Sequence, residues 1–130
     1  MLNPKFISFE EAIAIHDDQI ESFGGSFGLR DKGLLESALA QPEAFAFGEF
    51  LHPTIAGMAA AYLYHIARNH AFTDGNKRAA LGVTETFLRL NGYSLSFTDA
   101  ELYHLTLAVA EGQIEKSALS EALQTHLVKL

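Results

Sequence analysis

The sequence predicts an all-α fold, a compact bundle of six or seven helices with at most a minor extended segment. Three observations carry this prediction. Apolar residues recur at helical spacing along most of the chain, and capping or glycine signals separate these stretches at short intervals. The one alternating stretch, YSLSF at residues 93–97, is too short to build a sheet. With 130 residues and no linker-like tract, we expect a single domain over residues 1–130.

The first predicted helix runs from Ser8 to about Phe23. Ser8 and Glu11 have the spacing of a capping box, in which each side chain satisfies a free backbone amide of the other residue. Gly24 and Gly25 then end the helix, because glycine adopts the left-handed conformation of helix ends without steric cost.

A second helix is predicted within FGLRDKGLLESALAQP, residues 27–42, where leucine and alanine recur at helical spacing before Pro42. The next stretch, residues 43–50, is predicted to form a short helix or turn. Its phenylalanines, Phe45, Phe47 and Phe50, are assigned either to the core or to an exposed groove that receives an amphipathic helix of a partner.

The alanine-rich stretch from Pro53 to about Asn69 has a wide apolar stripe and is predicted to be the central, buried helix. Residues 77–90 form the next predicted helix, which stops at Asn91 and Gly92.

The C-terminal part of the chain contains two more predicted helices. Thr98 and Glu101 form a second capping box, which opens a helix that ends at Gly112. The last helix is predicted from about Ser117 through Leu127.

Composition limits the function. Nine basic residues against sixteen acidic ones give a net charge of −7, which argues against direct nucleic-acid binding, because that binding depends on neutralising phosphates. No apolar run approaches the length of a membrane span, and no export signal is visible, so no membrane partner and a cytoplasmic location are expected. The absence of cysteine suits a reducing compartment.

The segment HAFTDGNKR, residues 70–78, carries the candidate chemistry. Lys77 and Arg78 stand where a helix begins, although a helix N-terminus carries about half a positive charge and disfavours cations. Gly75 allows close approach to the backbone, and free amides at residues 76–78 bind phosphate. A polyphosphate ligand would offset both cations. The plain alternative is a solvated pair of surface cations.

Other residues of the segment fit phosphoryl or nucleotidyl transfer. His70 has an intrinsic pKa suited to taking a proton from an attacking hydroxyl. Asp74 is a suitable Mg²⁺ ligand together with phosphate oxygens, or else a plain helix cap. Phe72 is expected to point inward and anchor the loop. The five histidines outside the segment have no metal-ligand spacing and are assigned structural or surface roles: His16, His52, His65, His104 and His126.

This segment resembles the signature of the Fic/Doc superfamily, and specifically its Doc (death-on-curing) branch, H-x-F-x-D/N-x-N-K-R. His70, Phe72, Asp74, Asn76, Lys77 and Arg78 match every fixed position. Fic enzymes that transfer AMP have glycine at the position of Lys77 and a second arginine where this chain has Leu81. The segments IHDDQIESFGGSFGLRDKGLLESALAQP and FLRLNGY are also similar to the Doc pattern, so the resemblance covers nearly the whole chain.

The resemblance implies a compact helical toxin that is neutralised by an antitoxin with a helical C-terminal segment. It also implies a kinase that uses ATP and Mg²⁺ to phosphorylate elongation factor Tu and so arrests translation. By the same resemblance, the nucleotide binds reversed compared with Fic enzymes, with its γ-phosphate towards His70. Fic-type AMP transfer and a non-catalytic nucleotide- or phosphate-binding module remain the alternatives.

The roles that the resemblance implies fall on single residues. His70 is the expected general base and Asp74 the expected Mg²⁺ ligand. Asn76, Lys77 and Arg78 are the expected phosphate binders, and Gly75 gives the phosphates access to the backbone. Arg68, two residues before the histidine, is expected to contact phosphate or target.

Overall fold

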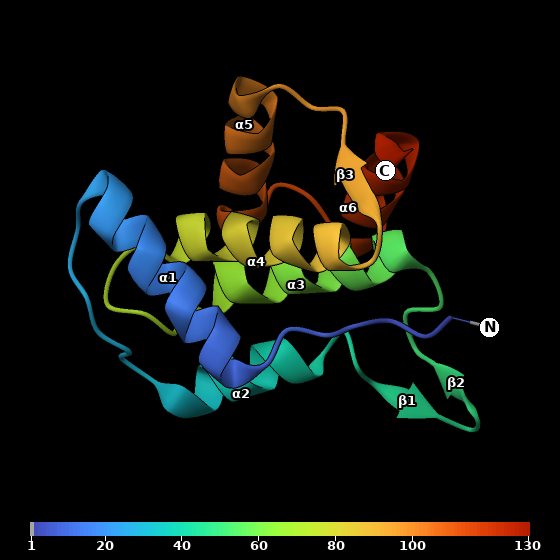
Figure 1. Cartoon of the computed structure of the whole chain (residues 1–130), viewed down its shortest axis with the longest axis horizontal. Helices are drawn as coiled ribbons and strands as arrows, with labels where there is room; N and C mark the ends of the chain where they lie inside the picture. Colours follow the sequence, from blue (N-terminus) through green and yellow to red (C-terminus); the bar gives the residue numbers. More distant parts are fainter. Residues whose placement is uncertain (1) are drawn as a thin grey trace.

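The computed structural model describes residues 2–130 and confirms the mostly helical architecture (Figure 1). The elements, in chain order, are α1 (Phe9–Phe23), α2 (Lys32–Ala40), β1 (Phe45–Ala46), β2 (Glu49–Phe50), α3 (Ile55–Asn69), α4 (Asn76–Leu90), β3 (Tyr93–Leu95), α5 (Asp99–Ala110), α6 (Lys116–Thr125) and β4 (Leu127–Lys129).

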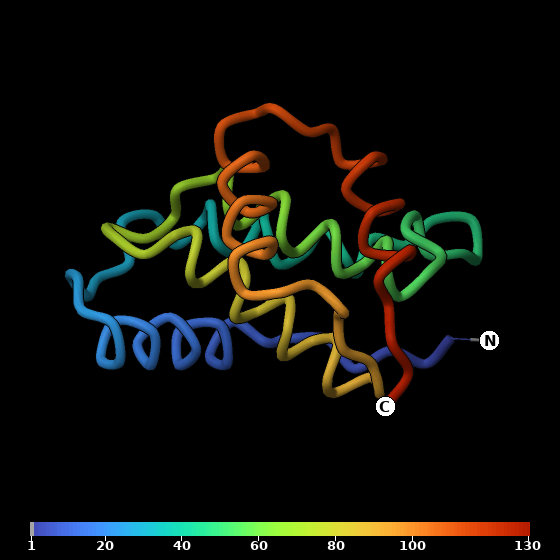
Figure 2. Tube along the Cα trace, turned by 90° about the horizontal axis from the view of Figure 1, so that it is seen from above, coloured from blue at the N-terminus to red at the C-terminus, as the bar shows by residue number. Residues whose placement is uncertain are grey.

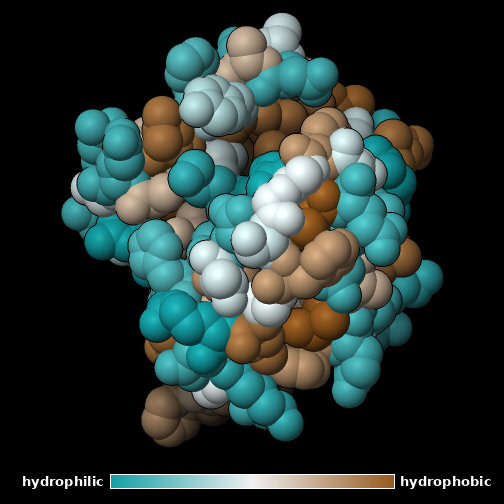
Figure 3. Space-filling model, turned by 90° about the vertical axis from the view of Figure 1, so that its left-hand side faces the viewer, coloured by the Kyte–Doolittle hydropathy of each residue, from teal (hydrophilic) through white to brown (hydrophobic). Residues whose placement is uncertain are grey.

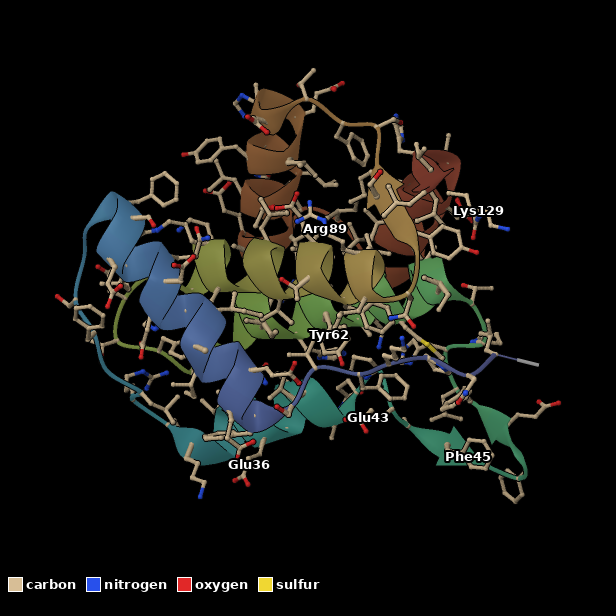
Figure 4. The ribbon with its side chains drawn as sticks, in the orientation of Figure 1. Glu36, Glu43, Phe45, Tyr62, Arg89 and Lys129 are labelled. Atoms are coloured by element: carbon tan, nitrogen blue, oxygen red, sulfur yellow. The ribbon has the colours of Figure 1, made fainter. Side chains whose placement is uncertain are left out.

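Helix α3 is the centre of the bundle. Every residue from Ile55 to Leu63 is buried, because small alanine side chains let the neighbouring helices approach closely. Helix α4 lies along it, α1 and α2 pack on one side, and α5 and α6 cover the other (Figures 1 and 2). Tyr62, near the middle of Figure 4, accepts a hydrogen bond from the backbone N–H of Ile7 at 2.9 Å, which ties the N-terminal segment to the core.

Local sequence signals set the helix ends as predicted. Ser8 and Glu11 form the complete capping box at the start of α1, and Thr98 and Glu101 form the second one at the start of α5. Each box satisfies two backbone amides that have no partner within the helix. Gly24 is the C-cap residue of α1, with a φ of 84°.

Two predicted elements differ from the structure: the helix alternative for residues 43–50, predicted as a short helix or turn, is wrong, and the last helix ends earlier than expected. Residues 43–50 do not form a helix but an antiparallel hairpin of β1 and β2, in which Phe45 pairs with Phe50. The last helix does not reach Leu127: α6 ends at Thr125, and β4 pairs antiparallel with β3. Both pairings depend on contacts that helical periodicity does not report, and the second joins segments more than thirty residues apart in the sequence.

The phenylalanines of the hairpin divide between core and surface. Phe50 packs against the core, and its ring lies 5.9 Å from that of Phe6 in an edge-on arrangement. Phe45 is 59% exposed, and Phe47, at the tip of the hairpin, is fully exposed. The core assignment is therefore confirmed for Phe50 alone.

Within residues 2–130, no helix has the length and apolar character that crossing a lipid bilayer requires.

Candidate active site

The motif segment is a tight loop between α3 and α4, at the left-hand end of the molecule in Figure 1. Phe72 points inward and is 2% exposed, as predicted. Asn76, the first residue of α4, clamps the loop, because its Oδ1 accepts from the Phe72 N–H at 2.9 Å and its Nδ2 donates to the Phe72 carbonyl at 3.0 Å. Gly75 precedes the helix with a φ of 74°, a conformation in which most side chains are strained.

His70 ends α3 in the left-handed conformation, with φ 51° and ψ 46°. This backbone conformation is uncommon for a residue other than glycine and needs support from its surroundings. Arg30 supplies that support, since its Nε donates to the His70 carbonyl at 3.0 Å and its Nη2 donates to the same oxygen. The imidazole itself is exposed to solvent and is therefore open to an incoming hydroxyl group.

The segment between α1 and α2 runs beside the motif loop. The carbonyl of Ala71 accepts hydrogen bonds from the backbone N–H groups of Arg30 and Asp31, and Thr73 donates to the carbonyl of Gly28 at 3.0 Å. Leu29 and Phe72 form an antiparallel bridge. The N-terminal third of the chain therefore builds one wall of the site.

Asp74 faces this wall with an exposed carboxylate. Its Oδ2 accepts from the Ser26 N–H at 3.0 Å and its Oδ1 from the Gly75 N–H at 2.8 Å. The hydrogen bond from Ser26 lowers the pKa of Asp74 most, and the one from Gly75 lowers it further. The positive charge of Arg78 acts in the same direction. The carboxylate stays ionised, as a Mg²⁺ ligand must be. It is not the N-cap of α4, because that position belongs to Gly75.

The two cations of the motif have different surroundings. Arg78 turns back to the C-terminal end of α1, where its Nη1 donates to the Gly24 carbonyl at 2.8 Å and lies 3.4 Å from the Gln19 carbonyl. The negative end of the α1 dipole thus compensates this charge without a ligand. Lys77 is exposed and has no carboxylate partner within residues 2–130. Of these two cations, Lys77 is the one whose charge nothing in the described part of the chain offsets.

A cavity of about 400 Å³ extends from the motif along the groove between α4 and α5. Residues 74–78 line one end of the groove, and Leu81, Leu102 and Tyr103 form its apolar walls. Glu85 lies farther along, where burial raises the pKa of its carboxyl group. Figure 3 shows this end of the molecule, with apolar surface exposed among hydrophilic residues.

Arg68 is exposed near the C-terminal end of α3. Its guanidinium lies 5.1 Å from the ring centroid of Tyr64 and also next to Gly112, at the end of α5. These contacts direct the side chain towards the loop between α5 and α6. Within residues 2–130, no hydrogen bond joins Arg68 to the motif loop, and its described contacts are those with Tyr64 and Gly112.

His16 of α1 contacts the motif loop, although it was predicted to have only a structural or surface role. It is 1% exposed, its ring stacks on Phe72 with 3.8 Å between centroids, and its Nε2 lies 2.7 Å from the Asp74 carbonyl oxygen. The structural role assigned to this histidine is confirmed. Its contact with the motif, 58 residues away, has no local signal in the sequence.

These features bring together the N-terminus of α4, an exposed histidine and an ionised carboxylate. Residues 6–88 match the model of the Fic/DOC family, and the chain belongs to this family. It is 47% identical over 75 residues to "Toxin Doc" of Mycolicibacterium smegmatis, a match that spans 58% of each chain. It is also 38% identical over 121 residues to "Protein kinase doc" of Escherichia phage P1, which covers 92% of this chain and 94% of the relative. The resemblance to the Doc branch is thereby confirmed.

Proposed function

We propose that this chain is a Doc-type toxin that transfers the γ-phosphate of ATP to a hydroxyl group of a protein target. The observation that carries the proposal is Lys77, a cation at the N-terminus of α4 for which residues 2–130 provide no carboxylate partner. A phosphate group offsets both this charge and the positive end of the helix dipole. The name of the phage P1 relative, a protein kinase, supports phosphate rather than nucleotide as the transferred group.

The proposed site works mainly by positioning and charge, as is usual for phosphoryl transfer. The exposed imidazole of His70 takes the proton of the attacking hydroxyl group. Amides at the start of α4 and the ammonium of Lys77 hold the phosphates, and Arg78 adds positive charge at the edge of the groove. Asn76 contributes by fixing the loop from which these groups extend.

The donor set around Asp74 fits Mg²⁺. One carboxylate with a lowered pKa and free lone pairs is a common protein contribution to such a site, with phosphate oxygens and water completing the shell. Within residues 2–130, no three metal-binding side chains come together, so this chain offers no preformed cage. Bound Mg²⁺ would neutralise charge that develops on the phosphates.

The experiment is transfer from ATP labelled at either the α- or the γ-phosphate to the proteins of a cell lysate. The proposal predicts protein labelling from the γ position in the parent protein and none with His70→Ala. Labelling from the α position alone indicates AMP transfer and overturns the phosphotransfer proposal. No labelling from either position, together with equal growth of cells that express the parent or His70→Ala, favours a binding module without catalysis.

The partners proposed for this chain are an antitoxin and a target in translation. The relative named "Toxin Doc" supports the antitoxin, and the resemblance of the motif implies elongation factor Tu as the target. Co-expression with the product of a neighbouring small gene is expected to restore growth. Mass spectrometry of elongation factor Tu from arrested cells is expected to find one added phosphate.

A further inference from the structure

His16 packs against the motif loop, where it contacts Phe72 and the backbone of Asp74. Among the buried residues of the described chain, it is the one histidine, and none of the others is a lysine, arginine, aspartate or glutamate; its exposure is 1%. Its ring is parallel to that of Phe72, with an angle of 4° between the planes. A Cβ atom at Gly75 would stand 3.5 Å from its Nε2, so the ring touches both sides of the loop.

The contact with the Asp74 carbonyl requires a hydrogen on Nε2 of this ring. A backbone carbonyl can only accept, so Nε2 of His16 must carry the hydrogen that it donates at 2.7 Å. The other nitrogen, Nδ1, lies 3.2 Å from a carboxylate oxygen of Asp17. The imidazole is therefore held between α1 and the loop, in the way that an outer partner orients the ligand of a metal site.

The hydrogen bond from His16 restrains the peptide group between Asp74 and Gly75, and through it the residues on both sides. Fixing its carbonyl oxygen fixes the ψ angle of Asp74 and the φ angle of Gly75, the two torsions on either side of the peptide plane. The first torsion aims the carboxylate of Asp74, and the second aims the amides that open α4. A phenylalanine at position 16 would keep the stacking but not the donated hydrogen bond.

We propose that His16 is the positioning residue of the phosphotransfer site, because it orients the Asp74 carboxylate and the α4 amides through one donated hydrogen bond. The inference rests on the proposed function for its effect on turnover. The effect of His16 on the conformation of the loop is independent of that function and can be measured without any reaction.

Three variants separate the hydrogen bond from the packing. His16→Gln places an amide nitrogen near the position of Nε2 and preserves the donor. His16→Asn reaches only the position of Nδ1, and His16→Phe keeps the stacking without a donor. We expect His16→Asn and His16→Phe to lower phosphate transfer about 10–100-fold and to raise the Mg²⁺ concentration that half-saturates the rate, whereas His16→Gln keeps most of the activity.

A second measurement is independent of catalysis. The backbone amide resonances of Gly75 and Asn76 should move in His16→Asn and His16→Phe and stay close to the parent in His16→Gln. The inference would be overturned if His16→Phe had the same transfer rate and amide shifts as the parent. It would also be overturned if His16→Gln lost as much transfer activity as His16→Phe. If the parent protein transfers no phosphate, the proposed function fails and the amide shifts alone decide the role of His16.

Discussion

Replacing Asn76 by alanine should separate the stability of the motif loop from its chemistry. The substitution removes the two hydrogen bonds that this side chain makes with the backbone of Phe72. At about 0.5–1.5 kcal/mol for each bond, the free energy of unfolding should fall by about 1–3 kcal/mol. For 130 residues, the unfolding entropy is roughly 0.27 kcal/mol/K, which gives a drop in melting temperature of about 4–11 °C. Phosphate transfer should fall at least tenfold, because the loop loses its geometry.

Asn91 provides a matched control at the other end of α4. Its Oδ1 accepts from the Lys5 N–H at 2.8 Å and its Nδ2 donates to the Lys5 carbonyl at 3.0 Å, so it clamps a backbone in the same way far from the motif. Its Nδ2 also donates to the Phe87 carbonyl at 2.8 Å, so Asn91→Ala should lower the melting temperature at least as much and leave transfer unchanged. Equal loss of transfer in both variants, or no loss of stability in Asn76→Ala, would refute the reasoning.

Two further predictions concern the wall of the site and the core. Gly25→Ala and Gly24→Ala both place a side chain at positive φ, at a cost of about 1–3 kcal/mol each, but only at Gly25 would the new Cβ stand 2.6 Å from the Asp74 carboxylate. Gly25→Ala should therefore also raise the Mg²⁺ requirement of transfer, and an equal rise in Gly24→Ala would contradict this. Burial, with the charge of Lys116, lowers the pKa of His65 to about 4, so between pH 6.5 and 4 the unfolded chain binds a proton that the folded chain does not. Thermal melting should show the parent losing more stability than His65→Gln on acidification across this range, and parallel losses would disprove the assignment.

Local patterns in the sequence specified much of this molecule. Both capping boxes, at Ser8 and Thr98, formed as predicted, because the interacting groups lie three residues apart. The motif loop also lay where it was expected, between α3 and α4, since its turn residues and the flanking helices are contiguous in the chain.

Features that depend on tertiary contacts escaped prediction. The hairpin of β1 and β2 and the pairing of β3 with β4 are set by packing on the helices and not by a period in the sequence. The same holds for Arg78, whose partner carbonyl at Gly24 is 54 residues away. Periodicity identifies which face of a segment is buried but does not say which distant group it will meet.

The arrangement of charge at α4 also differs from the expectation drawn from the sequence. The sequence predicts a ligand that offsets both cations of the motif, whereas in the structure the C-terminal end of α1 offsets Arg78. Neither cation has a carboxylate partner among residues 2–130, but Lys77, unlike Arg78, also has no backbone carbonyl to offset its charge there. Anion binding at this helix should therefore depend mainly on Lys77, whereas Arg78 also joins two helices and contributes to stability.

Calorimetric titration with Mg²⁺ and ATP tests the central claim most directly. The parent protein should bind ATP, and Lys77→Met should weaken the affinity about tenfold or more, because a charge-assisted contact with phosphate is lost. Lys129→Met removes an equal charge from β4, at the opposite end of the molecule in Figure 4, and should bind as the parent does. If the parent gave no binding heat, or if the parent and Lys77→Met bound ATP with equal affinity, the result would contradict a phosphate site at the start of α4.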